Sequence, residues 1–247
     1  MTYIYMKNYK ILKVIDKSDD YYTKIDKLFD LPFRLLINGK SQLSGKTTII
    51  LNLLLNPQFN YQQYFHGDDI YIISNNVLDN KLEIMAEKLE IPSENRMKFD
   101  EETLVSLYDS FEEQFMEETL DGGKPNNRLI IFDDCGYSNS LKNKQAGIIS
   151  KLICNGRHLN LSQIYTSQRF SQVSTVLRTN ITGAFLFNTS MKELDLIADD
   201  MNFTKSHKEF INIFREATSI PRSFLVVNFS NPRDELYMDQ NFNSIKY

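Results

Sequence analysis

The segment Phe33–Leu51 reads FRLLINGKSQLSGKTTIIL, and it decides the fold. A short apolar run, typical of a buried strand, leads into a polar loop that ends in Ser-Gly-Lys-Thr, and a second apolar run follows. Loops that hold nucleotide phosphates usually read G-x-x-x-x-G-K-[ST]. Counting back from Gly45, Lys40 occupies the position of the first glycine, and Gly39 lies one residue too early. The segment therefore predicts a phosphate-binding loop with a displaced glycine.

The residues at the end of this loop have distinct roles in such a site. The backbone N–H groups at a helix N-terminus bind anions, which assigns phosphate binding to Ser44, Gly45, Lys46, Thr47 and Thr48. The Lys46 ammonium would neutralise phosphate oxygens, and the Thr47 hydroxyl would be a ligand of Mg²⁺. A strand–turn–helix that contains these letters by chance is the alternative for this segment alone.

The rest of the chain alternates between strand and helix patterns. Further strands are expected at 69–76, 128–136, 161–169 and 183–188, and helices at 46–56, 78–91, 101–120, 141–160, 191–201 and 206–218. This alternation predicts an α/β fold of three layers with a mostly parallel sheet. The tail predicts a β-hairpin over about 221–242. We expect one domain over 31–247, preceded by an arm or edge strand over 1–30 with an apolar run at Ile11–Ile15.

The third expected strand ends in two adjacent carboxylates, Asp133 and Asp134. At the carboxyl end of a parallel strand, the first would hold Mg²⁺ through water, and the second would orient or deprotonate an attacking water. An acidic turn after a strand is common by itself. Following a phosphate loop, with a strand between the two, the pair indicates a nucleotide-hydrolysing site.

Two further residue types bear on catalysis. Gln168, at the end of the fourth expected strand, fits a sensor of the outer phosphate, with Thr166 and Ser167 as weaker candidates and a surface glutamine as the alternative. An arginine supplied from a neighbouring subunit can accelerate phosphoryl transfer by roughly 10³–10⁵. Arg157 is the first candidate for that role, and Arg178 and Arg169 are the others.

Composition limits the classes of function. The chain has 247 residues, 42% hydrophobic and 24% charged, and a formal net charge of −4, so tight nonspecific coating of nucleic acid by the whole surface is not expected. The apolar runs are shorter than the roughly 20 residues of a bilayer span. The two cysteines have no metal-ligand spacing and favour a reducing, intracellular setting.

Three segments together resemble a known family. PFRLLINGKSQLSGKTTIILNLL, RLIIFDDCG and NGRHLNLSQIYTSQRFSQVSTVLRTNITGAFLFN, within Phe33–Met201, look like the poxvirus-type genome-packaging ATPases of the FtsK–HerA superfamily, in the small version found in virophages and polinton-like elements. The resemblance implies the sheet order 5-1-4-3-2 and a ring of five or six subunits. Such a ring pumps double-stranded DNA into a preformed capsid, using ATP and Mg²⁺.

The resemblance also implies roles, partners and a location. Lys46, Asp134, Gln168 and the trans-acting Arg157 would be catalytic, and Thr47 and Asp133 would serve the metal. A capsid or portal-vertex protein would be a partner, and the protein would work in the host-cell cytoplasm, at the viral factory, or associated with the virion. The sequence departs from the family pattern at Lys40, in place of the first loop glycine, and at Leu43, in place of another small residue, so a wider loop path is expected. Asp134 stands where many relatives outside this branch have Glu, so the attacking water would lie closer to the strand.

Other functions remain open at this point. A regulatory GTPase is one, because DDCG contains D-x-x-G and Asn143–Ala146 begins like N-K-x-D, although the base-reading Asp is missing. A nucleotide-dependent scaffold for capsid assembly is another. A motor for DNA transfer or segregation is a nearer alternative, for which a membrane segment and an additional DNA-binding domain are missing from the sequence.

Overall fold

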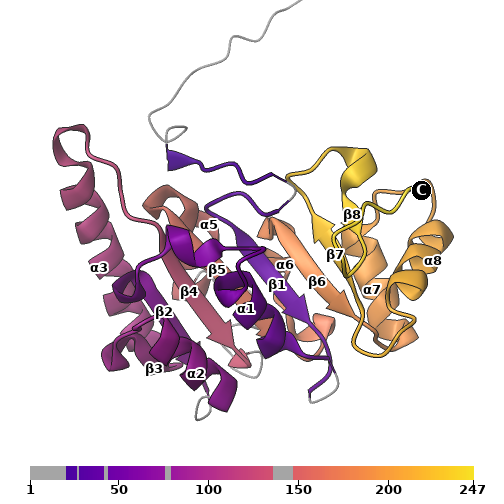
Figure 1. Ribbon diagram of the computed structural model, residues 1–247, viewed down its shortest axis with the longest axis horizontal. Coiled ribbons are helices and arrows are strands. Elements are labelled where there is room, and N and C mark those ends of the chain that lie inside the picture. The colour runs from indigo at the N-terminus through magenta and orange to yellow at the C-terminus, as the bar shows by residue number, and fades with distance from the viewer. Residues whose placement is uncertain (1–20, 27, 42–43, 76–78, 136–146) are drawn as a thin grey trace, which may run out of the picture.

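An eight-stranded sheet organises the chain in the computed structural model, which describes residues 21–26, 28–41, 44–75, 79–135 and 147–247 (Figure 1). The order is β3-β2-β4-β5-β1-β6-β7-β8. The strands are β1 (Arg34–Asn38), β2 (Ile70–Ser74), β3 (Arg96–Lys98), β4 (Arg128–Asp133), β5 (Leu161–Ser167), β6 (Gly183–Phe187), β7 (Phe224–Asn228) and β8 (Tyr237–Met238). The first six strands in this order, from β3 to β6, are parallel to one another. Strand β7 is antiparallel to β6, and β8 is antiparallel to β7.

The five expected parallel strands correspond to β1, β2, β4, β5 and β6. Their spatial order is β6-β1-β5-β4-β2, which reads 5-1-4-3-2 in the numbering of the expected strands. The sequence reading missed β3. Its three residues, Arg-Met-Lys, carry no apolar alternation, and they form a strand because they pair with Ile72–Ser74 of β2.

Helices cover both faces of the sheet and make three layers (Figure 1). One face packs against α1 (Lys46–Leu55) and α2 (Asn80–Lys88). The other packs against α3 (Glu101–Thr119), α5 (Ile148–Asn155), α6 (Thr175–Asn180), α7 (Met191–Met201) and α8 (His207–Ala217). Alternation within β1 divides the two cores, since Leu35 and Ile37 face α1 whereas Leu36 faces the opposite layer.

The helices differ from the expectation in two places. Helix α5 covers only 148–155 of the expected 141–160, because a 3-10 turn, Gly156–Leu159, follows it; residues 141–146 lie outside the described part. Helix α6 was not expected. Its six residues are too few for a periodic pattern, and the Ser174 hydroxyl caps it by accepting a hydrogen bond from the Leu177 N–H.

The N-terminal part of the described chain packs against the sheet, and the C-terminal part extends it. The expected strand at Ile11–Ile15 lies outside the described residues, but Thr23 and Leu31 form an antiparallel bridge, and Phe29 and Leu31 are buried under the sheet. At the other end, β7 and β8 form the expected hairpin. Among the described residues, no helix combines the length and apolar character that a membrane crossing requires.

Candidate functional site

The predicted site lies at the carboxyl edge of the sheet, where β1, β4 and β5 end next to one another. Parallel strands bring the residues that follow them to one edge, which is where α/β proteins bind ligands. A cavity of about 330 Å³ opens there. Its walls include the loop residues Ser44, Gly45, Lys46, Thr47 and Thr48 together with Asp133, Asp134 and Gln168. All eight residues predicted to act within one subunit therefore meet in one cavity.

The loop leads directly into helix α1. Gly45 has φ 93°, a left-handed conformation that suits glycine, and the helix begins at the next residue. The Lys46 ammonium lies over the loop and donates to the Gly39 carbonyl at 2.9 Å. Burial lowers the pKa of Lys46, and the carboxylates of Asp134 and Asp133 oppose this shift. The arrangement places a cation and a helix N-terminus on one cavity, which suits a polyanion.

The displaced glycine has a steric cause. A Cβ added to Gly39 would lie 2.6 Å from Ser44 Cβ, 2.8 Å from Ser44 Oγ and 2.9 Å from Phe187 Cβ. Gly39 also extends the strand pairing, since its N–H donates to the Ser167 carbonyl at 2.9 Å. Lys40 is exposed, and its carbonyl accepts from the Ser44 hydroxyl at 2.7 Å. The close approach therefore falls at residue 39, and residue 40 has room for a side chain.

The acidic pair is held by one hydroxyl from the neighbouring strand. Thr166 on β5 donates to Asp133 Oδ1 at 2.9 Å and accepts from the Asp134 N–H at 2.8 Å. Burial raises the pKa of Asp133, and the Asp134 charge adds to the rise, while Thr166 and Lys46 lower it. Asp134 has φ 50°, an uncommon backbone conformation for a residue with a side chain. Thr166, which the sequence offered only as a weak sensor candidate, thus positions the Asp133 carboxylate and the Asp134 backbone.

Gln168 contacts the second carboxylate. Its amide nitrogen Nε2 lies 2.9 Å from Asp134 Oδ1 and 3.0 Å from Asp134 Oδ2. The amide therefore donates toward the group expected to act on water. An amide that holds a carboxylate in place can also reorient when a phosphate enters the cavity, which fits the expected sensor position.

Four further residues line this cavity that sequence reasoning missed: Ser41 in the phosphate loop, Ser74 at the end of β2, and Asp79 and Lys81 at the start of α2. The Lys81 ammonium donates to the Thr48 hydroxyl at 3.0 Å and so reaches the phosphate loop from a different helix. The Asp79 carboxylate caps α2 through the Lys81 N–H at 2.6 Å. The sheet topology could have indicated Ser74, Asp79 and Lys81, because β2 is parallel to β4 and the residues that follow both strands must lie at the same edge.

The candidate arginines lie apart from this cavity or are engaged elsewhere. Arg157 is exposed and precedes β5, so it lies at the amino edge of the sheet, opposite the phosphate loop. Arg178 forms an ion pair with Asp200 at 2.5 Å and lies over the Phe170 ring at 5.3 Å. Arg169 is exposed and follows Gln168. Asn143–Ala146, the segment like a guanine-binding motif, lies outside the described residues.

Comparison with known proteins gives a family and relatives. The Poxvirus A32 protein family matches residues 22–240. DNA packaging protein OPG160 of variola virus is 26% identical over 192 residues, which cover 76% of this chain and 65% of that protein, and OPG160 of vaccinia virus (strain Western Reserve) matches to the same extent. The chain thus spans about 65% of the length of these curated relatives.

Solved structures share the fold at low sequence identity. B204, the DNA-packaging ATPase from Sulfolobus Turreted Icosahedral Virus, superposes with a TM-score of 0.53 at 15% identity, covering 81% of this chain and 94% of B204. EssC (ATPases 2 and 3) from Geobacillus thermodenitrificans gives 0.52 at 17% identity, covering 80% of this chain and 38% of that one. The fold is that of the P-loop ATPases. With the family match extending over most of its length, the chain belongs to the Poxvirus A32 protein family.

Proposed function

We propose that this chain is a Mg²⁺-dependent ATPase that moves double-stranded DNA into a preformed viral capsid. Its relatives of the OPG160 type are named DNA packaging proteins, and B204 is named a DNA-packaging ATPase. One observation from the chain itself carries the proposal. The phosphate loop, the acidic pair and Gln168, which come from three separate strands, line one cavity of about 330 Å³.

The cavity suits a nucleotide triphosphate with its metal. Lys46 and the N–H groups at the start of α1 would bind the phosphates, and Lys81 adds a second ammonium beside Thr48. Mg²⁺ prefers hard oxygen ligands, and Thr47 and Asp133 offer a hydroxyl and a carboxylate on this cavity. When bound, Mg²⁺ would neutralise phosphate charge, with Asp133 holding it through water.

The acidic pair divides the remaining work. Asp134 would orient the attacking water and accept its proton while a new bond forms from the water oxygen to the terminal phosphorus and the bond to the ADP oxygen breaks. The Gln168 amide, 2.9–3.0 Å from both oxygens of Asp134, would fix that carboxylate or release it according to the occupancy of the cavity.

Arg157 would complete the site of a neighbouring subunit. It is exposed at the edge of the sheet opposite its own phosphate loop, so within one subunit it is far from the chemistry. In a homo-oligomeric ring, the amino edge of one subunit's sheet would face the phosphate loop of the next subunit. The Arg157 guanidinium would then lie beside the terminal phosphate bound there. An arginine in that position is worth roughly 10³–10⁵ in rate.

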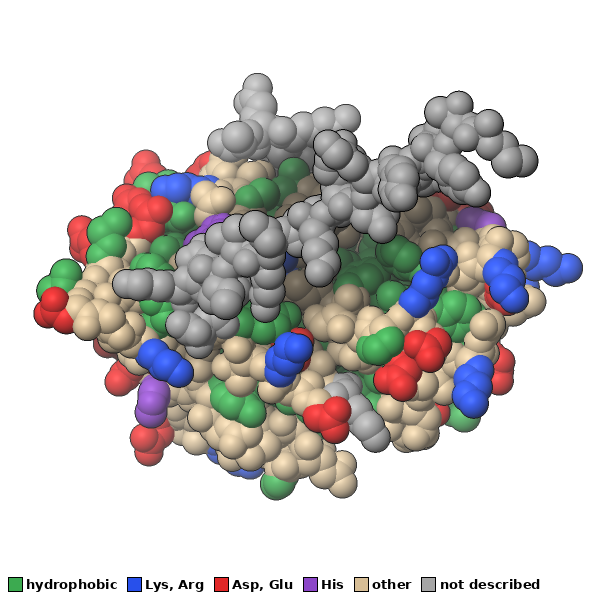
Figure 2. Space-filling view, turned by 90° about the horizontal axis from the view of Figure 1, so that it is seen from above, with side chains coloured by type: hydrophobic (Ala, Val, Ile, Leu, Met, Phe, Trp, Pro, Cys, Tyr) green, Lys and Arg blue, Asp and Glu red, His purple; other side chains and the backbone are tan. Residues whose placement is uncertain are grey.

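DNA would be bound inside such a ring by contacts that several subunits share. On the face shown in Figure 2, Lys and Arg side chains are dispersed among Asp and Glu side chains. The formal net charge is −4. Both features favour weak contacts summed over subunits, as suits a motor that must release DNA at each step. A capsid or portal-vertex protein would be the second partner, and the viral factory in the host cytoplasm the place of action.

The test is ATP hydrolysis as a function of protein concentration, with and without double-stranded DNA. We expect specific activity to rise with concentration and with DNA, and to disappear in Lys46→Ala. Arg157→Ala should lose activity but recover part of it when mixed with Lys46→Ala, because each mutant then supplies the residue that the other lacks. Arg215→Ala, which changes an exposed arginine of α8 outside the phosphate cavity, is the control and should keep its activity.

Several results would overturn the proposal. A rate that is independent of concentration and of DNA would leave a subunit acting alone, as a scaffold or switch would. GTP that displaces ATP from the site would favour the regulatory GTPase. Mixed mutants that stay inactive would remove Arg157 from the trans position.

A further inference from the structure

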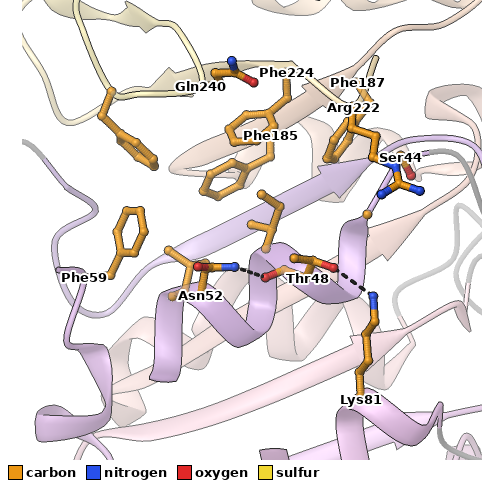
Figure 3. Close-up of a pocket in the computed structure, with 14 residues that line it drawn as sticks. Ser44, Thr48, Asn52, Phe59, Lys81, Phe185, Phe187, Arg222, Phe224 and Gln240 are labelled. Atoms are coloured by element: carbon orange, nitrogen blue, oxygen red, sulfur yellow. Dashed lines mark hydrogen bonds between the residues drawn. The ribbon is translucent and has the colours of Figure 1, made fainter. Parts of the chain in front are cut away.

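A second cavity adjoins the phosphate cavity. It encloses about 360 Å³ and lies between helix α1, strands β6 and β7, and the C-terminal segment (Figure 3). Ser44, Gly45, Thr48 and Lys81 line both cavities. The Lys81–Thr48 hydrogen bond, at 3.0 Å, marks their junction. The two spaces are therefore continuous at the end of the loop that holds the phosphates.

Phenylalanine rings make up the walls of this second cavity. Phe185 and Phe187 come from β6, Phe224 from β7, Phe59 from the segment after α1, and Phe242 from the C-terminal segment. Ring centroids lie 5.6 Å apart for Phe185 and Phe224 and 5.1 Å apart for Phe59 and Phe242. Phe59, Phe224 and Phe242 are partly exposed and present apolar faces to the cavity, whereas Phe185 and Phe187 are buried and back its wall. Aromatic faces stack well on flat heterocycles.

A few polar groups lie on the same cavity. Asn52, one turn after Thr48, donates to the Thr48 carbonyl at 2.8 Å and accepts from the Asn56 amide at 3.2 Å. The side chains of Gln240 and Arg222 are exposed at the rim (Figure 3), and neither makes a hydrogen bond or ion pair with the residues that the structure describes. A pocket that combines aromatic and aliphatic walls with a few free polar groups is typical of a small-molecule site.

We propose that the aromatic cavity, defined by Phe59, Phe185, Phe187, Phe224 and Phe242, holds the purine base and ribose of the nucleotide whose phosphates bind the loop. The proposal rests on the proposed ATPase function, because it needs phosphates at Lys46. The base stacks on the partly exposed rings of Phe59, Phe224 and Phe242, and Gln240 and Arg222 reach its polar edge or the ribose. Lys81 lies at the junction, where the phosphate nearest the ribose would pass.

Continuity favours a nucleotide over other occupants. A peptide or a second copy of the chain could fill an apolar hollow, but neither needs the hollow to open onto a helix N-terminus and two ammonium groups. A nucleotide has an apolar flat end and an anionic end joined by a short sugar, and the two joined cavities present matching surfaces in that order. The volume, about 360 Å³, lies within the range of small-ligand pockets.

The experiment separates base binding from phosphate binding. Titration calorimetry with Mg²⁺ present measures the affinity of the full chain for ATP and for inorganic tripolyphosphate, which has no base. Phe242→Ala removes a ring from the far end of the cavity. We expect its dissociation constant for ATP to rise about tenfold while that for tripolyphosphate changes less than about twofold, since base stacking on one aromatic ring is lost.

Two further variants complete the design. Phe229→Ala is the matched control, because Phe229 is a partly buried phenylalanine of the same C-terminal region that packs on Phe203 outside both cavities. It should leave both affinities unchanged. Asn52→Phe places a bulky ring in the cavity from the surface of α1. It should abolish ATP binding and retain tripolyphosphate binding, and it keeps the test decisive if Phe242→Ala unfolds.

The outcomes distinguish a wrong site for the base from a wrong function for the protein. If ATP and tripolyphosphate bind and Lys46→Ala abolishes both, but Asn52→Phe and Phe242→Ala leave ATP affinity unchanged, the base lies elsewhere and the cavity belongs to a peptide or a second copy. If wild type binds neither compound, or if Lys46→Ala binds ATP normally, the ATPase function itself is overturned.

Discussion

The position of the first loop glycine leads to a prediction that tests the steric argument. Gly39→Ala adds a Cβ at 2.6 Å from Ser44 Cβ and 2.9 Å from Phe187 Cβ, whereas carbon atoms in contact normally lie about 3.5–4.0 Å apart. A Cβ cannot rotate away, so relief requires backbone movement of about 1 Å between β1 and the loop. Overpacking of this kind costs about 1–3 kcal/mol.

The steric strain should lower both the stability of the fold and the affinity for ATP. Ser44 lines the phosphate cavity, so displacing it moves backbone groups expected to bind phosphate. We expect Gly39→Ala to lose about 1–3 kcal/mol of unfolding free energy. If about 1.4 kcal/mol of the strain reaches the loop, ATP affinity falls about tenfold. Urea denaturation followed by circular dichroism measures the first quantity, and titration calorimetry the second.

Lys40→Ala, one residue later in the loop, is the control for Gly39→Ala. The Lys40 side chain is exposed, and its carbonyl, which the substitution preserves, accepts the Ser44 hydroxyl. Its stability should stay within about 0.5 kcal/mol of wild type. If Gly39→Ala matches Lys40→Ala in both stability and ATP affinity, the close approach at residue 39 does not govern the loop, and the reasoning fails.

Three further predictions concern the buried polar groups. Thr166→Val removes the donor to the Asp133 carboxylate and the acceptor of the Asp134 N–H, so stability should fall by about 1–3 kcal/mol. The pH profile of hydrolysis should move upward, because the hydroxyl lowers the pKa of Asp133, and an unmoved profile would contradict this. Burial raises the pKa of Asp133, so the folded chain binds that proton more strongly than the unfolded chain, and stability is lost as pH rises through the raised pKa. Asp133→Asn should therefore be inactive yet more stable than wild type near pH 7, with the gap closing toward about pH 4 in urea titrations, and a gap independent of pH would refute it. Glu118→Ala should lower the free energy of unfolding, measured by urea denaturation, by about 3–5 kcal/mol. Arg128 is fully buried, and its Nη2 donates to the Glu118 carboxylate at 2.5 Å, so the substitution leaves a buried charge unpaired. A loss below about 1 kcal/mol would show that the ion pair is dispensable.

The candidate site was predictable where local pattern and chemistry coincide. Gly45, Lys46 and Thr47 follow a buried strand and open a helix, and Asp133 and Asp134 end another strand, so spacing alone places them at one edge of a parallel sheet. The expected fold class, family resemblance and C-terminal hairpin are confirmed. The roles of the site residues, and of Arg157 above all, stay predictions.

Other features depended on contacts between distant segments. Strand β3 has no apolar alternation and exists because β2 offers it a partner. Lys81 enters the site because α2 starts beside the phosphate loop, and Thr166 because β5 lies next to β4. None of these relations has a fixed spacing along the chain, so no local pattern reports them.

The sequence by itself determined the alternation of strands and helices, the loop and the acidic pair, because helix and strand periods and turn chemistry act over a few residues. Only the tertiary structure decided where the glycine must lie, which hydroxyl holds the Asp133 carboxylate, and that five phenylalanines from four segments surround one cavity. The physical reason is that close packing is a property of atoms brought together from distant parts of the chain.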